Sequence, residues 1–190
     1  ASGSHLIYYA GKKLGLPCAN LRLYSVYGPL EDASRLIPNL IYEGMQSRYP
    51  QLVNPDISRD FVYIDDVCEA FVDAALSLKE EHYGESFNIG TGIQTTISEI
   101  AYLVKKLFQI EASPVFSSMP NRKWDASNWF ANPEKAKSCI SWTAKTTLEE
   151  GMLKTIKWFE ILEDVKRYKQ RSKLFGVDTI YSISAIIACY

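Results

Sequence analysis

The sequence predicts an α/β fold, because short apolar strands alternate with helices along most of the chain. Residues 19–25 and 61–64 are short apolar runs bounded by turn residues, as expected for buried strands. Residues 4–14 and 66–79 carry apolar side chains at helical spacing. Alternation of this kind is typical of a parallel sheet covered by helices.

The helix boundaries follow from capping residues. The first helix is expected to end at Gly15-Leu16-Pro17, since glycine suits a helix exit and proline cannot continue a helix. Thr96 to Glu99 and Thr147 to Glu150 have the capping-box pattern, which predicts helices that begin there. Another helix is expected at about 35–46, and Pro133 suits the first turn of a short one.

Composition limits the class of protein. The chain has 190 residues with 47% hydrophobic and 23% charged residues, which is ordinary for a globular domain. A net charge of -1 argues against a general nucleic-acid-binding surface. The four cysteines lack zinc-site spacing, so no metal is expected, and reduced thiols in a cytoplasmic protein are the interpretation. The longest apolar run, 183–190, is too short for a membrane span.

The chain is expected to divide into three parts. Residues 1–160 form the main domain, the charged segment 161–177 continues the last helix into a linker, and 178–190 form the first strand of a following domain. Residues 182–190 resemble the opening strand of an inverting-type glycosyltransferase, and two alternatives stay open: an ordinary terminal strand and the start of a membrane segment.

Two segments carry the chemistry. Ser58-Arg59-Asp60-Phe61-Val62-Tyr63-Ile64-Asp65-Asp66-Val67 is followed by Phe87-Asn88-Ile89-Gly90-Thr91-Gly92. They are expected to form strand, helix, strand and tight glycine turn. Arg59, Asn88 and the flexible backbone of the turn would then face a cleft, as an anionic sugar-phosphate ligand requires. Three aspartates, Asp60, Asp65 and Asp66, are interpreted as structural caps in preference to catalytic acids.

The order of these motifs resembles a known family. Leu21-Arg22-Leu23-Tyr24-Ser25-Val26-Tyr27-Gly28-Pro29, the two segments above, and Asn121-Arg122-Lys123-Trp124-Asp125 are together similar to the extended short-chain dehydrogenase/reductases, the NAD-dependent epimerase/dehydratase group. The resemblance covers about residues 1–160 and implies the end of a Rossmann-type parallel sheet plus the smaller α/β substrate-binding lobe. It further implies that this is the C-terminal half of such an enzyme, without the NAD-binding half.

The resemblance assigns no catalytic residue to this chain. The family's Tyr-x-x-x-Lys pair would end one residue before Ala1. Tyr8 with Lys12 and Tyr9 with Lys13 have the same spacing, but they lie about three helical turns past the expected position and are interpreted as packing residues.

The resemblance does assign binding residues. Arg59 and Arg122 correspond to the arginines that bind the substrate diphosphate, and Asp125 to a carboxylate near the nucleotide ribose. Ser25 stands where many relatives have an asparagine that contacts the sugar phosphates. Leu23 and Tyr24 match the segment against the nicotinamide ring. Asn88 is near the substrate or stabilises its turn. The aromatic residues Trp124, Trp129 and Phe130 line the pocket or pack in the core.

The implied function is that of an NAD- or NADP-dependent nucleotide-sugar epimerase or dehydratase, which oxidises a sugar carbon transiently. The ligand would be a nucleoside-diphosphate sugar, and the first helix would contribute to a homodimer. The fragment alone is expected to be inactive. Two alternatives stay open: a 4-keto reductase of the same fold, and a non-catalytic module that binds RNA or a protein.

Overall fold

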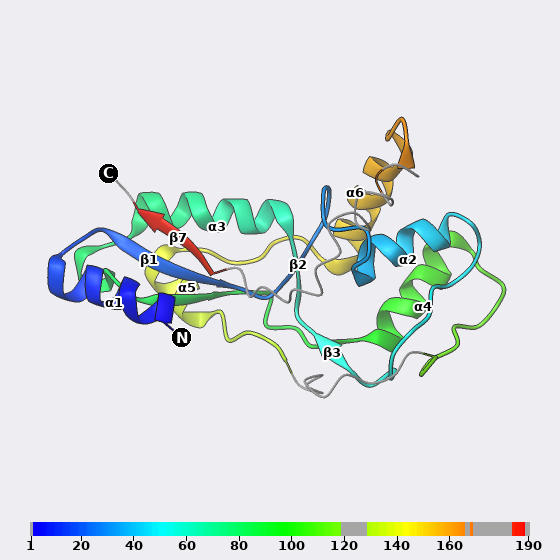
Figure 1. Ribbon diagram of the computed structural model, residues 1–190, viewed down its shortest axis with the longest axis horizontal. Coiled ribbons are helices and arrows are strands. Elements are labelled where there is room, and N and C mark those ends of the chain that lie inside the picture. The colour runs from blue at the N-terminus through cyan, green and yellow to red at the C-terminus, as the bar shows by residue number, and fades with distance from the viewer. Residues whose placement is uncertain (1, 119–128, 166–167, 169–183, 189–190) are drawn as a thin grey trace.

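The computed structural model describes residues 2–118, 129–165, 168 and 184–188. Its first part is a three-stranded sheet in the order β5-β1-β7. Strand β1 (Cys18–Leu23) pairs in parallel with β5 (Ser86–Ile89) and antiparallel with β7 (Ser184–Ala188). The expected C-terminal strand is therefore present and joins the same sheet as β1 (Figure 1). Its assignment to a following domain stays a prediction.

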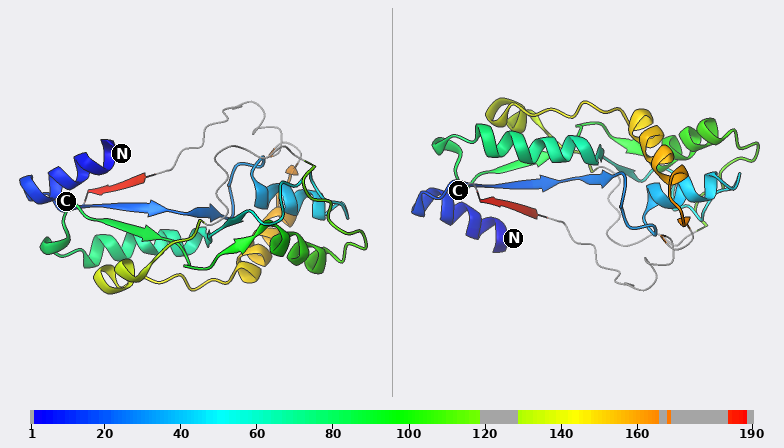
Figure 2. Two further views of the ribbon diagram at one scale, coloured as in Figure 1. Left: turned by 90° about the horizontal axis from the view of Figure 1, so that it is seen from below. Right: turned by 90° about the horizontal axis from the view of Figure 1, so that it is seen from above.

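Helices cover both faces of this sheet. Helix α1 (Ser2–Leu14) lies on one face, and α3 (Ile64–Ser77) and α5 (Glu134–Ile140) lie on the other, as both views of Figure 2 show. The core on the α3 side is built from alternate strand residues and from both helices: Ala19, Leu21, Val62, Val67, Ala70, Ala74, Phe87, Ile89, Ala136, Ile140 and Trp142. A short 3-10 helix, η1 (Glu80–His82), precedes β5.

A second lobe lies beyond the carboxyl ends of β1 and β5. It contains α2 (Leu36–Gly44), α4 (Ile97–Phe108) and α6 (Leu148–Glu160), which share a separate apolar core. Two small sheets connect the lobes. In one, β2 (Ser25–Tyr27) runs parallel to β4 (Phe61–Tyr63), and in the other β3 (Ser58–Arg59) runs antiparallel to β6 (Thr95–Thr96).

Local sequence signals account for most helix starts. Thr96 accepts from the backbone N–H of Glu99, whose carboxylate accepts from the Thr96 N–H, so the predicted capping box is confirmed. Thr147 and Glu150 form the same arrangement at α6. The short helix α5 begins directly after Pro133.

Two expectations about element boundaries were wrong. The segment 19–25 is not one strand: the Tyr24 N–H donates to Ile89 O, whereas the Ser25 N–H donates to Asp60 O. The chain therefore changes partner strands at this point and passes from β1 into β2. Helix α6 ends at Glu160 and does not continue into the predicted linker.

Among the helices that the structure describes, none is both long and apolar enough to cross a bilayer.

Candidate functional site

Arg59 lies at the junction of the two lobes, on strand β3. Pairing of β3 with β6 fixes its backbone, and one terminal N–H group donates to Ser58 O at 2.7 Å. The Cζ atom lies 5.4 Å from the centre of the Trp129 ring, within the range of a cation–π contact. Strand pairing thus holds the backbone of Arg59, and the Ser58 carbonyl and the Trp129 ring restrain its guanidinium.

Trp129 belongs to an aromatic pair beside Arg59. Its ring meets that of Tyr24 edge-on, with 6.5 Å between the ring centres. Burial raises the pKa of the Tyr24 hydroxyl. Trp129 is 46% exposed and Phe130 is 48% exposed. Core packing, one of the two interpretations left open for these residues, is therefore wrong.

Asp60 has a structural role that the sequence indicated only in general terms. Its side chain is 0% exposed. One oxygen accepts from the Thr91 N–H at 2.8 Å and from the Thr91 hydroxyl, and the other accepts from the N–H groups of Gly92 at 2.9 Å and Ala131 at 3.0 Å. The carboxylate thereby joins the glycine turn to the segment that carries Trp129. Such multiply bonded buried carboxylates stabilise strongly, because their donors come from the fixed backbone.

The expectation that the glycine turn presents free backbone to a ligand needs correction. The N–H groups of Thr91 and Gly92 already donate to Asp60. Glycine is required at position 90 for a different reason, since an added Cβ would lie 2.7 Å from an Asp60 carboxylate oxygen. The turn serves close packing around a carboxylate, and a phosphate would have to displace Asp60 to use it.

The other predicted residues lie near Arg59 to different degrees. Ser25 is adjacent through the backbone, because β2 pairs with β4 immediately after Asp60. Leu23 lies at the end of β1, opposite Ile89. Asn88 pairs in register with Arg22, and its amide donates to Asn132 O at 3.4 Å. Of the predicted binding residues, Tyr24 and Arg59 both contact the Trp129 ring.

Arg122, Trp124 and Asp125 lie outside the described residues. The roles of Arg122 and Asp125 toward the diphosphate and the ribose, and the convergence of Arg59 and Arg122, stay predictions.

Asp65 and Asp66 were expected to cap their own helix, and for Asp66 this is wrong. Its buried carboxylate accepts from the N–H groups of Lys145 and Thr146 and from the Thr146 hydroxyl. It therefore ties the start of α3 to the loop before α6. The side chain of Asp65 is 64% exposed and lies 3.8 Å from the Lys154 ammonium.

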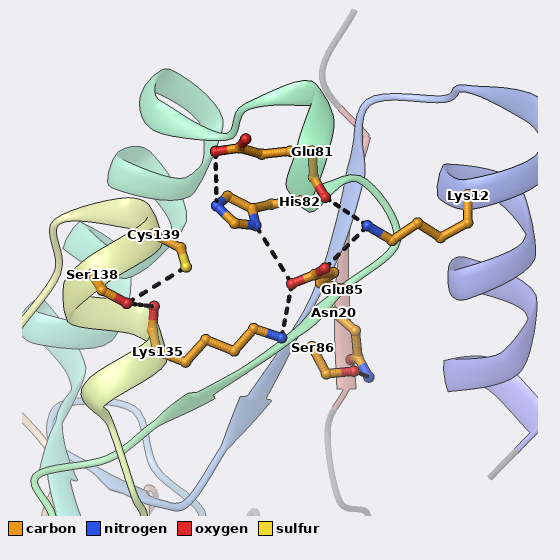
Figure 3. A network of polar contacts seen from close by, with 9 residues as sticks. All are labelled: Lys12, Asn20, Glu81, His82, Glu85, Ser86, Lys135, Ser138 and Cys139. Atoms are coloured by element: carbon orange, nitrogen blue, oxygen red, sulfur yellow. Dashed lines mark hydrogen bonds and ion pairs between the residues drawn. The ribbon is translucent and has the colours of Figure 1, made fainter.

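A network of charged groups lies at the opposite end of β5 (Figure 3). The Glu85 carboxylate meets Lys12 of α1 at 3.0 Å and Lys135 of α5 at 2.9 Å, and His82 at 3.5 Å. The hydrogen bond from Lys135, supported by Lys12, lowers the Glu85 pKa from 4.5 to about 2. A pocket of about 550 Å³ adjoins this network, lined by Ser4, His5, Tyr8, Arg22, Gly84, Glu85, Ser86 and Lys135. None of the predicted site residues that the structure describes lines it.

The described residues do not form an NAD site by themselves. Their glycine turn after β5 is engaged by Asp60, which leaves its amide groups unsuited to a pyrophosphate. Leu23 and Tyr24 could supply only a wall beside a cofactor held elsewhere.

Comparison with known proteins agrees with the fold. The Thermotoga maritima UDP-glucose 4-epimerase, solved with UDP-glucose, superposes with a TM-score of 0.73 at 28% identity, over 84% of this chain and 51% of that one. The Bacillus cereus UDP-glucuronic acid 4-epimerase, solved with UDP-glucuronic acid and NAD, gives 0.71 at 27% identity, over 84% and 50%.

A curated relative is the Arabidopsis thaliana trifunctional UDP-glucose 4,6-dehydratase/UDP-4-keto-6-deoxy-D-glucose 3,5-epimerase/UDP-4-keto-L-rhamnose-reductase RHM3. It is 30% identical over 161 residues, which are 84% of this chain and 24% of the relative. The chain thus spans about a quarter of this relative and about half of each solved structure.

Fold and site together define a Rossmann-like α/β protein with an arginine held at the junction of its sheet and its smaller lobe. Residues 1–90 match the profile of the NAD dependent epimerase/dehydratase family. The resemblance that the motifs indicate is confirmed. Which half of the relatives the chain corresponds to stays a prediction.

Proposed function

We propose that this chain forms the diphosphate-binding side of an NAD(P)-dependent nucleotide-sugar epimerase or dehydratase. The observation that carries the proposal is Arg59, a guanidinium restrained by Trp129 and Ser58 at the junction of the lobes. A guanidinium fork offers paired donors to phosphate oxygens. The UDP-sugar ligands named for the Thermotoga and Bacillus epimerases support the same ligand class.

Each predicted residue has a distinct task in this proposal. Arg59 and Arg122 bind the diphosphate, Asp125 binds the ribose, and Ser25 and Asn88 donate to the sugar or its phosphates. Leu23 and Tyr24 lie beside the nicotinamide. The chain contributes binding and orientation, and it holds no catalytic group.

The proposal also includes a homodimer through α1. Four of its large apolar side chains are more than half exposed: Leu6, Tyr8, Tyr9 and Leu14. Exposed apolar surface on one helix is typical of an interaction surface.

Calorimetric titration of the chain with UDP-glucose tests the function. Arg59→Ala should weaken binding about 10- to 100-fold, because each hydrogen bond to a charged group contributes about 1.5–3 kcal/mol. The affinity of Arg59→Lys for UDP-glucose should lie between those of Arg59→Ala and the unmodified chain, since lysine keeps the positive charge without the guanidinium fork. Arg48→Ala is the matched control, because Arg48 is 60% exposed and pairs with Glu43. Equal affinities for Arg59→Ala and the unmodified chain would refute the proposal.

Turnover is the second readout. Mixed with NAD and UDP-glucose, the chain alone should bind nucleotide and form no product. Measured turnover would overturn the assignment of the catalytic residues to another part of the protein.

A further inference from the structure

We propose that Trp129 is a positioning residue that holds the Arg59 guanidinium ready for a diphosphate. This inference rests on the function proposed above. It assigns to an exposed aromatic side chain a task that is separate from contact with the ligand.

The geometry supports a restraint on Arg59. The guanidinium carbon lies 5.4 Å from the centre of the indole, and one terminal N–H group donates to Ser58 O at 2.7 Å. Attraction to the ring face is electrostatic and uses no hydrogen-bond acceptor. The ring can therefore limit the rotamers of Arg59 without competing with phosphate oxygens for its donors.

Trp129 is itself fixed to the same part of the backbone. Two residues further along, the Ala131 N–H donates at 3.0 Å to the buried carboxylate of Asp60, the residue that follows Arg59. Tyr24 meets the indole edge-on from the end of β1. Arg59 is thus one residue, and Trp129 two residues, from the hydrogen bond that joins Asp60 to Ala131.

Pre-organisation of this kind raises affinity, because the arginine loses less side-chain freedom when the ligand binds. A cation–π contact at a partly exposed site corresponds to about a two- to fivefold effect on an equilibrium constant. The effect should depend on Arg59 and on the phosphates of the ligand.

A double-mutant cycle on the chain tests this, with UDP and uridine as probes in calorimetric titrations. Trp129→Leu should weaken UDP binding about two- to fivefold and leave uridine binding unchanged. In an Arg59→Ala background, Trp129→Leu should have no further effect. Trp129→Phe, which retains a ring, should recover part of the loss. Tyr102→Leu is the control, since Tyr102 of α4 is an aromatic residue of similar exposure that contacts Phe116 and lies outside the candidate site.

The possible outcomes distinguish the positioning role of Trp129 from the proposed function on which it rests. If Arg59→Ala weakens UDP binding but Trp129→Leu has the same effect in both backgrounds, the positioning role is refuted and the diphosphate role stands. If Arg59→Ala leaves UDP binding unchanged, both the positioning role of Trp129 and the diphosphate role of Arg59 are refuted. Equal losses for UDP and uridine in Trp129→Leu would indicate direct contact with the nucleoside and also refute positioning.

A spectroscopic readout does not depend on ligand. The Nε–H proton of Arg59 should show a ring-current shift in the NMR spectrum of the free chain, and Trp129→Leu should abolish it while Tyr102→Leu does not. An unchanged resonance in Trp129→Leu would show that the ring does not restrain the guanidinium. Circular dichroism spectra that match those of the unmodified chain would establish that each variant is folded.

Discussion

Carboxylates join distant segments in two regions of this molecule, and they use different donors. At the junction of the lobes, Asp60 and Asp66 are 0% and 3% exposed and accept mainly from backbone N–H groups. At the far end of β5, the side chain of Glu85 is 24% exposed and meets the ammonium groups of Lys12 and Lys135. Backbone donors are fixed by the fold, whereas lysine side chains lose conformational freedom when they pair. The junction should therefore be the stronger connection.

The largest expected effect is at Asp60. Asp60→Asn keeps the shape, but its NH₂ group then faces either the N–H of Thr91 or the N–H groups of both Gly92 and Ala131. We expect the free energy of unfolding to fall by about 3 kcal/mol, measured by urea denaturation. The exposed neighbour Asp65 supplies the control, and Asp65→Asn should change little. Equal stabilities of the two variants would show that the junction depends on packing alone.

Asp66 should have a smaller effect, because fewer donors meet its carboxylate. Asp66→Asn is expected to lower the free energy of unfolding by about 2 kcal/mol. Hydrogen exchange gives a local readout: the amides of Lys145 and Thr146 should exchange faster, because both donate to this carboxylate. Unchanged exchange at both amides would contradict the tie between α3 and the loop before α6.

The contribution of Glu85 to stability should depend on pH, which tests the comparison between the two regions further. Because its pKa falls from 4.5 to about 2 on folding, its contribution is fully present above 4.5 and is lost as the pH falls through about 2. Solvent screening at this partly exposed site should limit the effect of Glu85→Gln at neutral pH to about 1 kcal/mol. Thermal melts across the acid range should show the variant and the unmodified chain converging. A difference in Tm that persists at the lowest pH would show that the charge of Glu85 is not its cause.

The smallest effect is expected for an exposed ion pair on the protein surface. The ammonium of Lys106 lies 2.8 Å from Glu149, with side chains 68% and 45% exposed. Lys106→Gln should change the free energy of unfolding by no more than about 0.5 kcal/mol, since exposed pairs are screened by solvent. A larger change in urea denaturation would remove the distinction between buried and exposed carboxylates.

The sequence predicts those features that depend on short-range chemistry. The capping boxes at Thr96 and Thr147 could be identified because both partners lie within one helical turn. The partners of Asp60 and Asp66 could not, because they lie 31 to 80 residues away along the chain. Sequence patterns indicate that such a carboxylate is structural, but only the fold shows which segment it holds.

The candidate site follows the same division. The motif makes Arg59 a candidate, whereas its contact with Trp129 and the nearby hydrogen bond between Asp60 and Ala131 are visible only in the fold. No periodicity connects residues so far apart. The sequence does not predict the strand break at Tyr24 for a related reason: a change of pairing partner does not alter the pattern of apolar residues.

The adjacency of Arg59 and Asp60 has a consequence for folding. Successive residues of an extended segment point to opposite sides, and here the carboxylate is enclosed while the guanidinium lies at the edge. A pairing shifted by one position would force a cation into the interior and leave three amides without their acceptor. Mispaired strands are thus disfavoured by the same two side chains, and the arginine of the candidate site also favours the correct assembly of the strands.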